Sequence, residues 1–286
     1  MPIGDFPDQT YLIDSRGLGE RLGAVTLIDL RPAEDFSVGH IEGSRHLDIY
    51  GVSLNDSSEG PLKAFLPIFR TLFGARGVSL GKPVVIYDHE TGERAARAVW
   101  LLAVLGHPDV RILDGGTQAW TASGKRLVRL TGAPPAADPV RAPPTPPPFK
   151  GTPNPELLAT RFDVHQAIDD EQSVIVDVRR ESEHLGTERR ARRVGTIPGA
   201  VHIFWRDHLD EKGAFRPADE ILDLYASRGV TADKTIVPFC HGGYRSANTF
   251  LALKSLGYPR VRNYVGSWAE WGNRDDSQII VPNPPG

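Results

Sequence analysis

The chain carries one internal duplication, and this repeat limits its possible folds more than any other feature. The segment 84–96 matches the segment 235–247, and the same offset continues downstream through arginine, glycine, proline and tryptophan. The matching pairs are Arg94 and Arg245, Gly106 and Gly257, Pro108 and Pro259, Gly115 and Gly266, and Trp120 and Trp271. With 286 residues the chain is long enough for two domains, so the repeat predicts two copies of one fold in tandem.

An earlier block is also repeated, but with a different offset. Residues 27–31 match 175–179, and residues 39–46 match 195–202. Because the offset grows between the two blocks, the second copy holds an insertion near 187–194. This stretch is rich in glutamate and arginine, which predicts an exposed loop.

A proline-rich segment separates the two copies. Proline runs favour extended polyproline conformation and cannot pack as regular helix or sheet. We therefore expect an N-terminal domain over residues 1–130, a linker over 131–155 and a C-terminal domain over 156–286. The linker is expected to lie across both domains as a strap, with a disordered tether as the alternative.

In both copies, short apolar segments alternate with segments of helical spacing. The candidate strands are 25–30, 84–87, 110–113, 174–178, 200–203, 235–239 and 261–264, and the candidate helices are 94–105 and 218–228. This alternation predicts an α/β fold in which each copy has a mainly parallel sheet with helices on both faces. In such sheets, active sites lie at the carboxyl ends of the strands.

Cys240, the only cysteine, directly follows the predicted strand 235–239. A helix is expected over 246–256, closed by Gly257, so the thiol lies on a tight loop at a helix N-terminus. Backbone N–H groups in such a loop favour negative charge, which should lower the thiol pKa and keep the sulfur as the nucleophilic thiolate. The alternative is that Cys240 is a small buried hydrophobic residue. A single cysteine also excludes an intrachain disulfide.

Three motifs, in their order along the chain, resemble the rhodanese family. They are Gly-x-Ile-Pro-Gly-Ala at 195–200, the loop Cys-x-x-Gly-x-Arg at 240–245, and Gly-Ser-Trp-x-Glu-Trp at 266–271. The resemblance covers nearly the whole chain and implies two tandem rhodanese-like domains. Tandem chains in which only the second copy carries the cysteine resemble the thiosulfate and mercaptopyruvate sulfurtransferases.

The resemblance implies sulfur transfer through a persulfide. The Cys240 thiolate would attack the outer sulfur of thiosulfate, release sulfite, and pass the terminal sulfur to cyanide or a thiol, with no cofactor. The loop backbone suits this chemistry, because inward-facing amides stabilise both thiolate and persulfide anions. The residues that contribute these amides are His241, Gly242, Gly243 and Tyr244.

Two arginines are expected to bind the anionic donor. Arg245 closes the loop and can pair with an anion, or it can hold the loop through carbonyl or carboxylate contacts. The resemblance also places Arg179 at the donor, with an ordinary surface salt bridge as the alternative. Asp177 is expected to orient the site through hydrogen bonds. The arginines named in the insertion are expected to be solvated; they are Arg189, Arg192 and Arg193.

The choice of donor follows from a departure from the family pattern. His241 stands where thiosulfate enzymes often have arginine, and we expect it to be partly neutral at pH 7. Mercaptopyruvate enzymes often continue with Gly-Ser-Gly-Val-Thr after the cysteine, a pattern that Tyr244 and Arg245 do not match. Thiosulfate is therefore the favoured donor and mercaptopyruvate the alternative.

In the first copy, His89 occupies the position of the cysteine. An imidazole cannot form a persulfide, and Glu90 and Glu93 in the same loop would repel an anionic donor. The first copy is therefore expected to be catalytically silent and to supply one wall of an interdomain cleft.

Two other classes of function are open alternatives. Cysteine-dependent phosphatases use a similar loop, but typically with one more residue between the cysteine and the arginine. A non-catalytic rhodanese-like scaffold would fit the first copy, which lacks the cysteine, but not the second. A Cys240→Ser variant separates these classes, because an enzyme loses turnover and a scaffold keeps its partner.

Composition argues against several further classes. The net charge of −3 gives no support for nucleic-acid binding, and the nine histidines show no metal-ligand spacing. No signal peptide and no membrane-spanning apolar run is visible. We expect a cytoplasmic monomer whose partners are the sulfur donor and an acceptor such as cyanide, a small thiol or thioredoxin.

Overall fold

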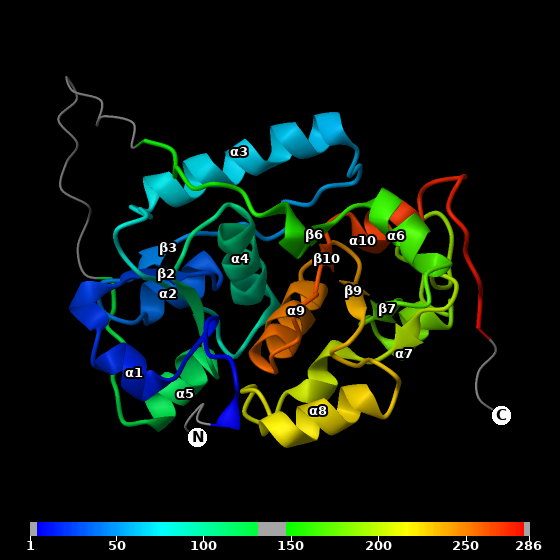
Figure 1. Cartoon of the computed structure of the whole chain (residues 1–286). Coiled ribbons are helices and arrows are strands. Elements are labelled where there is room, and N and C mark those ends of the chain that lie inside the picture. The colour runs from blue at the N-terminus through cyan, green and yellow to red at the C-terminus, as the bar shows by residue number, and fades with distance from the viewer. Residues whose placement is uncertain (1–4, 131–146, 283–286) are drawn as a thin grey trace.

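The apolar runs of the first half form a five-stranded parallel sheet in a computed structural model that describes residues 5–130 and 147–282 (Figure 1). The strand order is β1-β5-β4-β2-β3. The strands are β1 (Leu12–Ile13), β2 (Thr26–Asp29), β3 (Arg45–His46), β4 (Val84–Tyr87) and β5 (Val110–Leu113). The helices of this half are α1 (Ser15–Gly19), η2 (Leu22–Ala24), α2 (Ala33–Val38), α3 (Glu59–Ala75), α4 (Glu93–Val104) and α5 (Gly116–Ala122).

The second half repeats this topology, with β10 shorter than its counterpart β5. Its strands are β6 (Leu158–Ala159), β7 (Ser173–Asp177), β8 (Val201–His202), β9 (Thr235–Phe239) and β10 (Asn263–Tyr264). They pair as β10-β6 and β8-β7-β9, all parallel, and a parallel bridge from Ile236 to Val261 joins β9 to the chain before β10. The helices are η3 (Pro155–Leu157), α6 (Arg161–Ile168), α7 (Glu181–His184), η4 (Trp205–His208), α8 (Ala218–Ala226), α9 (Arg245–Ser255) and α10 (Ser267–Trp271).

These elements confirm the predicted α/β class and most of the predicted strands. The strands β4, β5 and β9 have the predicted bounds, whereas β8 and β10 are shorter than the predicted 200–203 and 261–264. Helix α8 ends at Ala226 rather than Arg228, because Gly229 adopts a left-handed φ of 75° and reverses the chain.

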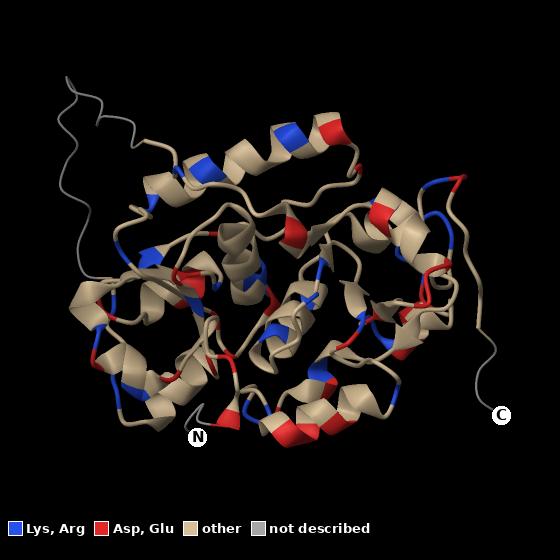
Figure 2. Cartoon of the chain, in the orientation of Figure 1, with Lys and Arg blue, Asp and Glu red and all other residues tan. Residues whose placement is uncertain are grey.

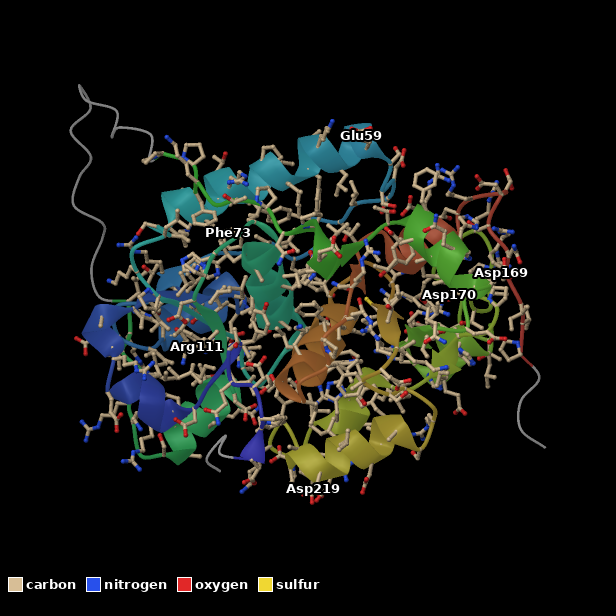
Figure 3. All side chains as sticks on the ribbon, in the orientation of Figure 1. Glu59, Phe73, Arg111, Asp169, Asp170 and Asp219 are labelled. Atoms are coloured by element: carbon tan, nitrogen blue, oxygen red, sulfur yellow. The ribbon has the colours of Figure 1, made fainter. Side chains whose placement is uncertain are left out.

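The longest helix of the described residues, α3, was not predicted from the sequence. Phe65, Phe69 and Phe73 recur at helical spacing along it and are buried. All three belong to the main apolar cluster, and Figure 3 labels Phe73 near one end of this helix. Pro67 lies inside this helix and weakens the helical signal in the sequence.

Part of the predicted linker packs against the first half. Phe149 is buried, and the Arg70 guanidinium donates to the carbonyl oxygens of Phe149 and Gly151 at 3.0 and 2.9 Å. The backbone N–H of Asn154 donates to the Val104 carbonyl at the end of α4, at 2.7 Å. Residues 131–146 lie outside the described residues, so the strap and the domain boundaries 1–130, 131–155 and 156–286 stay predictions.

The two halves meet along α4 and α9, which lie side by side at the centre of the molecule (Figure 1). Both helices are buried over nearly their whole length, because each lies between its own sheet and the other half. One continuous apolar cluster extends through both halves. Basic and acidic residues are interspersed over both halves (Figure 2), which fits the near-neutral net charge.

His208 provides a test of how the second half is held together. Its Nδ1 lies 2.9 Å from the Tyr225 hydroxyl and its Nε2 lies 2.7 Å from Asn248 Oδ1, so one buried ring joins η4, α8 and α9. Burial lowers the pKa of His208 to about 4, although the Asn248 side chain opposes this shift.

We expect the free energy of unfolding to fall by up to about 3 kcal/mol as the pH drops from about 6.5 to 4. In this window His208 is protonated in the unfolded chain but stays neutral in the folded protein, so stability rises with pH. Urea denaturation between pH 4 and 7 measures this slope. The slope should be shallower in His208→Gln, and equal slopes in the two proteins would show that His208 is not its source.

Candidate active site

Cys240 lies where β9 ends and α9 begins, as the sequence predicted. The residue is buried, with 1% of its surface exposed. The Gly243 N–H donates to the Cys240 Sγ at 3.1 Å, and the Ser246 hydroxyl lies 3.6 Å from the same sulfur. Gly243 adopts a φ of 80°, a left-handed conformation that turns its N–H toward the sulfur. Of the four predicted loop amides, the one that donates to the sulfur is that of Gly243.

The surroundings of Cys240 favour its thiolate form. Burial by itself would raise the pKa of the Cys240 thiol, but the positive charge of Arg245 and hydrogen bonds from Ser246 outweigh it, and the pKa is lowered. Glu93, from the first half, opposes this shift. These surroundings match those of a reactive thiolate rather than those of a small buried hydrophobic residue.

Arg245 is held by a carboxylate that the sequence analysis did not single out. Its two terminal nitrogens donate to the Glu183 carboxylate at 2.5 and 3.0 Å, and both side chains are buried. Burial would raise the pKa of Glu183, but the hydrogen bonds from Arg245 lower it. This fork-to-fork pair matches the second of the two roles considered for Arg245, that of holding the loop through a carboxylate.

Arg179 lies in a different network. Its guanidinium donates to both oxygens of Asp177, at 2.8 and 2.6 Å, and to the Gly195 carbonyl at 2.8 Å. It also stacks over the Trp268 ring, 4.3 Å from the ring centroid. Asp177 in turn accepts from the Thr196 hydroxyl at 2.8 Å, and Arg179 and its neighbours hold the pKa of Asp177 well below its usual range despite burial.

The first half contains the same network without a cysteine. Arg31 donates to Asp29 and to the Gly39 carbonyl, each at 2.6 Å. Because this arrangement recurs in a half without a nucleophile, it belongs to the shared fold. The placement of Arg179 therefore gives no support to the expected contact with the donor. The alternative, a surface salt bridge, does not describe Arg179 either, because its pair with Asp177 is buried. The geometry of Asp177 matches an orienting role.

Both halves contribute to the small cavity that contains Cys240. Its volume is about 200 Å³. The first half lines it with Tyr50, Gly51, Ser53 and Glu93, and the second half lines it with Arg190, Cys240, His241, Gly242, Tyr244 and Arg245. The first half thus supplies one wall of the cleft, as expected.

Two side chains of the Cys240 loop, His241 and Tyr244, add no positive charge to the cavity. Burial, followed by the charge of Arg190, lowers the pKa of His241 to about 4, so this side chain is neutral at pH 7. The Tyr244 hydroxyl donates to the Ile49 carbonyl at 2.7 Å and docks the loop onto the first half. The positive charge in the cavity therefore comes from Arg190 and Arg245.

His89 cannot substitute for the cysteine in the first half. Its Nε2 lies 3.0 Å from Asp35 Oδ2, and its side chain is about half exposed. Glu90, expected to repel a donor there, pairs with Arg206 of the second half at 2.6 and 3.0 Å. Glu93 was expected to repel a donor from the first half's own loop, but it lines the Cys240 cavity.

The insertion loop is ordered by contacts with the chain after α10. The Arg193 N–H donates to the Gly272 carbonyl at 2.9 Å, and the Arg192 guanidinium pairs with Asp275. Arg189 and Arg192 are exposed, as expected of solvated side chains, whereas Arg193 is partly buried. Arg190, which the sequence analysis did not single out, lines the cavity.

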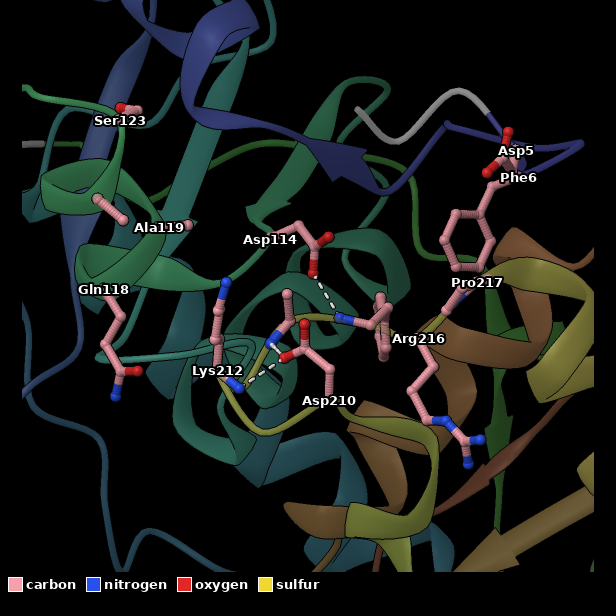
Figure 4. A pocket seen from close by; sticks show the side chains of 13 residues that line it. Asp5, Phe6, Asp114, Gln118, Ala119, Ser123, Asp210, Lys212, Arg216 and Pro217 are labelled. Atoms are coloured by element: carbon pink, nitrogen blue, oxygen red, sulfur yellow. Dashed lines mark hydrogen bonds between the residues drawn. The ribbon is translucent and has the colours of Figure 1, made fainter. Parts of the chain in front are cut away.

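A larger cavity, of about 450 Å³, lies elsewhere between the halves (Figure 4). The residues that line it are Asp5, Phe6, Asp114, Gln118, Ala119, Ala122, Ser123, Asp210, Lys212, Ala214, Phe215, Arg216 and Pro217. Asp114 accepts a hydrogen bond there from the Phe215 N–H at 3.0 Å. No residue of the Cys240 loop lines this cavity, so its size does not make it the reaction site.

Sequence reasoning missed the cavity residues that come from elsewhere in the chain. They are Tyr50, Gly51, Ser53 and Arg190. Glu183, the partner of Arg245, was missed as well. The one available signal was the insertion itself, whose arginines follow the motif residue Arg179 closely. Within the described residues, no cluster of three or more candidate ligands could hold a metal ion, and no helix is long and apolar enough to cross a membrane.

Known proteins match this chain over both of its halves. The rhodanese-like domain model matches residues 15–123 and 160–274. A thiosulfate sulfurtransferase from Pseudomonas aeruginosa is 34% identical, covering 96% of this chain and 99% of the relative. One from Azotobacter vinelandii is 35% identical, with 97% and 99% covered. The crystal structure of SseA from Escherichia coli, a 3-mercaptopyruvate sulfotransferase, has a TM-score of 0.72 at 28% identity, covering 91% of this chain and 99% of that one. With both repeats matched and full-length relatives above 30% identity, the chain belongs to the rhodanese family.

Proposed function

We propose that the protein is a thiosulfate sulfurtransferase, which moves sulfane sulfur from thiosulfate to cyanide or a thiol through a persulfide on Cys240. The observation that carries the proposal is the buried Cys240 sulfur, which accepts the Gly243 N–H and whose pKa is lowered beside Arg245. Relatives of similar length that bear this name support the choice of donor.

The reaction consists of two displacements at sulfur. The Cys240 thiolate attacks the outer sulfur of thiosulfate, forming one S–S bond while the bond to the sulfite sulfur breaks, and sulfite leaves with the electron pair. Cyanide then attacks the terminal persulfide sulfur, thiocyanate leaves, and the Cys240 thiolate is regenerated. Since the sulfur is an anion before and after each step, the Gly243 N–H and the Ser246 hydroxyl stabilise both resting forms.

We assign the donor contact chiefly to Arg190 rather than to Arg179. Arg190 lines the cavity, its side chain is 40% exposed, and its nearest acidic partner, Glu183, is already engaged by Arg245 at shorter distance. Its guanidinium is thus available to a doubly charged anion. Arg245, which also lines the cavity, adds positive charge, and Arg179 positions the strand end through Asp177.

Replacing Arg190 with glutamine is expected to raise the KM for thiosulfate by about tenfold and to change kcat less, because the lost contact is a charge-assisted hydrogen bond to the donor. Arg189→Gln is the matched control. Arg189 is exposed, and its Nη1 donates to the Arg192 carbonyl at 2.5 Å rather than facing the cavity. Steady-state kinetics of both variants measure these KM values. An unchanged KM for thiosulfate in Arg190→Gln would show that Arg190 does not contact the donor.

Mercaptopyruvate is the second candidate donor, on the similarity to the Escherichia coli structure. As acceptors we propose cyanide, small thiols or a reduced carrier such as thioredoxin. We further propose that the protein acts as a monomer in the cytoplasm. Light scattering of the purified chain tests the monomer, and fractionation of cells tests the location.

The decisive experiment is the intact mass of the protein after incubation with thiosulfate, and again after cyanide is added. We expect a gain of one sulfur atom that cyanide removes. If thiosulfate gives no gain and mercaptopyruvate does, the donor assignment is wrong. If neither donor adds sulfur, the sulfurtransferase proposal fails and the phosphatase or scaffold alternatives must be tested.

A further inference from the structure

A buried arginine of the catalytically silent half contacts the Cys240 loop. Arg97 lies on α4, is fully buried, and donates from Nη1 to the Gly242 carbonyl at 2.8 Å. Its guanidinium lies over the Tyr244 ring, 4.4 Å from the centroid. Among the described residues, its Nε and Nη2 atoms have no hydrogen-bond partner, so no carboxylate is hydrogen-bonded to either of them.

The carbonyl that Arg97 contacts belongs to the peptide group whose N–H reaches the sulfur. The Gly242 C=O and the Gly243 N–H are two ends of one planar unit. One end accepts from Arg97 at 2.8 Å, and the other donates to the Cys240 Sγ at 3.1 Å. A positive charge on the carbonyl polarises the peptide and strengthens the hydrogen bond that its N–H makes to the sulfur.

The same contact fixes which way this peptide faces. With glycine on both sides the peptide plane rotates easily, and a flipped plane would present the carbonyl oxygen to the sulfur. Arg97 Nη1 approaches so closely that a Cβ on Gly243 would lie 2.3 Å from it. The next carbonyl, that of Gly243, is held separately by the Asn263 side chain at 3.2 Å. Arg97 is therefore the side chain that holds the Gly242–Gly243 peptide with its N–H inward.

The charge balance around Arg97 points in the same direction. A guanidinium buried without a carboxylate is costly unless an anion lies nearby. Burial lowers the pKa of Arg97, and the groups that oppose this shift and favour its charged form are Tyr244 and Cys240. At neutral pH the Tyr244 phenol is protonated, since burial raises its pKa, which leaves the Cys240 thiolate as the anion that compensates Arg97.

We infer that Arg97 is a positioning residue for the reactive sulfur. From the first half it fixes and polarises the Gly242–Gly243 peptide, and it supplies the buried positive charge that stabilises the Cys240 thiolate and, if the proposed function holds, the persulfide. The silent half thus completes the anion-binding loop of the other half.

The test uses the fact that Cys240 is the only cysteine, so that alkylation of the protein by iodoacetamide reports on this sulfur alone. The rate is measured against pH for the wild type, Arg97→Met, Arg97→Lys and the control Arg206→Met. Arg206 also joins the two halves, through Glu90, but does not line the Cys240 cavity. No sulfur donor is present, so failure of the sulfurtransferase proposal would leave this measurement unaffected.

We expect the apparent pKa of Cys240 to rise by about one unit in Arg97→Met, to be partly restored in Arg97→Lys, and to stay unchanged in Arg206→Met. An unchanged pH profile in a folded Arg97→Met protein overturns the inference. If circular dichroism shows that this variant does not fold, Arg97→Gln replaces it. Glutamine keeps an N–H donor but no charge, so a wild-type profile in a folded Arg97→Gln protein overturns the inference equally.

Discussion

Cys240→Ser is expected to take up no sulfur from thiosulfate and to lower turnover by at least about 10⁴-fold, because a serine hydroxyl is not ionised at neutral pH and forms no persulfide. Intact mass and the rate of thiocyanate formation measure the two effects. The substitution is nearly isosteric, so the Gly243 and Ser246 contacts around position 240 are preserved. Any loss therefore belongs to the sulfur itself.

The reciprocal change, His89→Cys, is the control for the first half, which lacks the cysteine. Position 89 is exposed, and the nearby acidic groups Asp35 and Asp88 disfavour a thiolate. We expect no sulfur uptake at position 89 and an unchanged rate at Cys240. Sulfur uptake by Cys240→Ser, or a new persulfide at position 89, would contradict the assignment of the chemistry to the Cys240 loop.

Glu183→Gln is expected to lower the free energy of unfolding by about 3–5 kcal/mol, because it leaves the buried Arg245 guanidinium without its carboxylate. Urea denaturation at pH 7 gives the value. The same change should reduce sulfur transfer, since Arg245 begins α9 and its charge lowers the pKa of Cys240.

Glu220→Gln is the matched control for this second prediction. Glu220 pairs with Arg216 at 2.5 Å, but both side chains are substantially exposed. Exposed pairs of this kind contribute little, so the change should cost less than about 1 kcal/mol. Equal effects of the two substitutions would mean that Glu183 and Arg245 do not form a structural unit at the base of the loop.

The comparison of the two halves separates architecture from chemistry. Asp29 with Arg31, and Asp177 with Arg179, form the same buried network at the ends of β2 and β7. A motif that recurs in the half without the cysteine describes the fold, even where a family resemblance suggests a role in binding. The proposed chemistry rests on a difference between the halves, the cysteine at position 240 against the histidine at position 89.

Much of this protein was determined by local sequence pattern. Apolar runs at 84–87, 110–113 and 235–239 became strands with those bounds, because a buried parallel strand requires a short continuous apolar segment. The duplication predicted two copies of one topology. The position of Cys240 between a strand and a helix predicted its loop and its lowered pKa, since backbone geometry and the helix N-terminus act over a few residues.

The tertiary structure alone decided what surrounds the sulfur. Arg97, Glu183 and Arg190 are far from Cys240 in the chain. Arg97 reaches its loop through the packing of α4 against α9, Glu183 from α7, and Arg190 from the insertion. Charge and hydrogen-bond forces depend on distances of a few ångströms, whereas periodicity in a sequence specifies only which face of an element is buried. The sequence therefore determined the nucleophile and its loop, and the packing of the two halves decided which charges hold them.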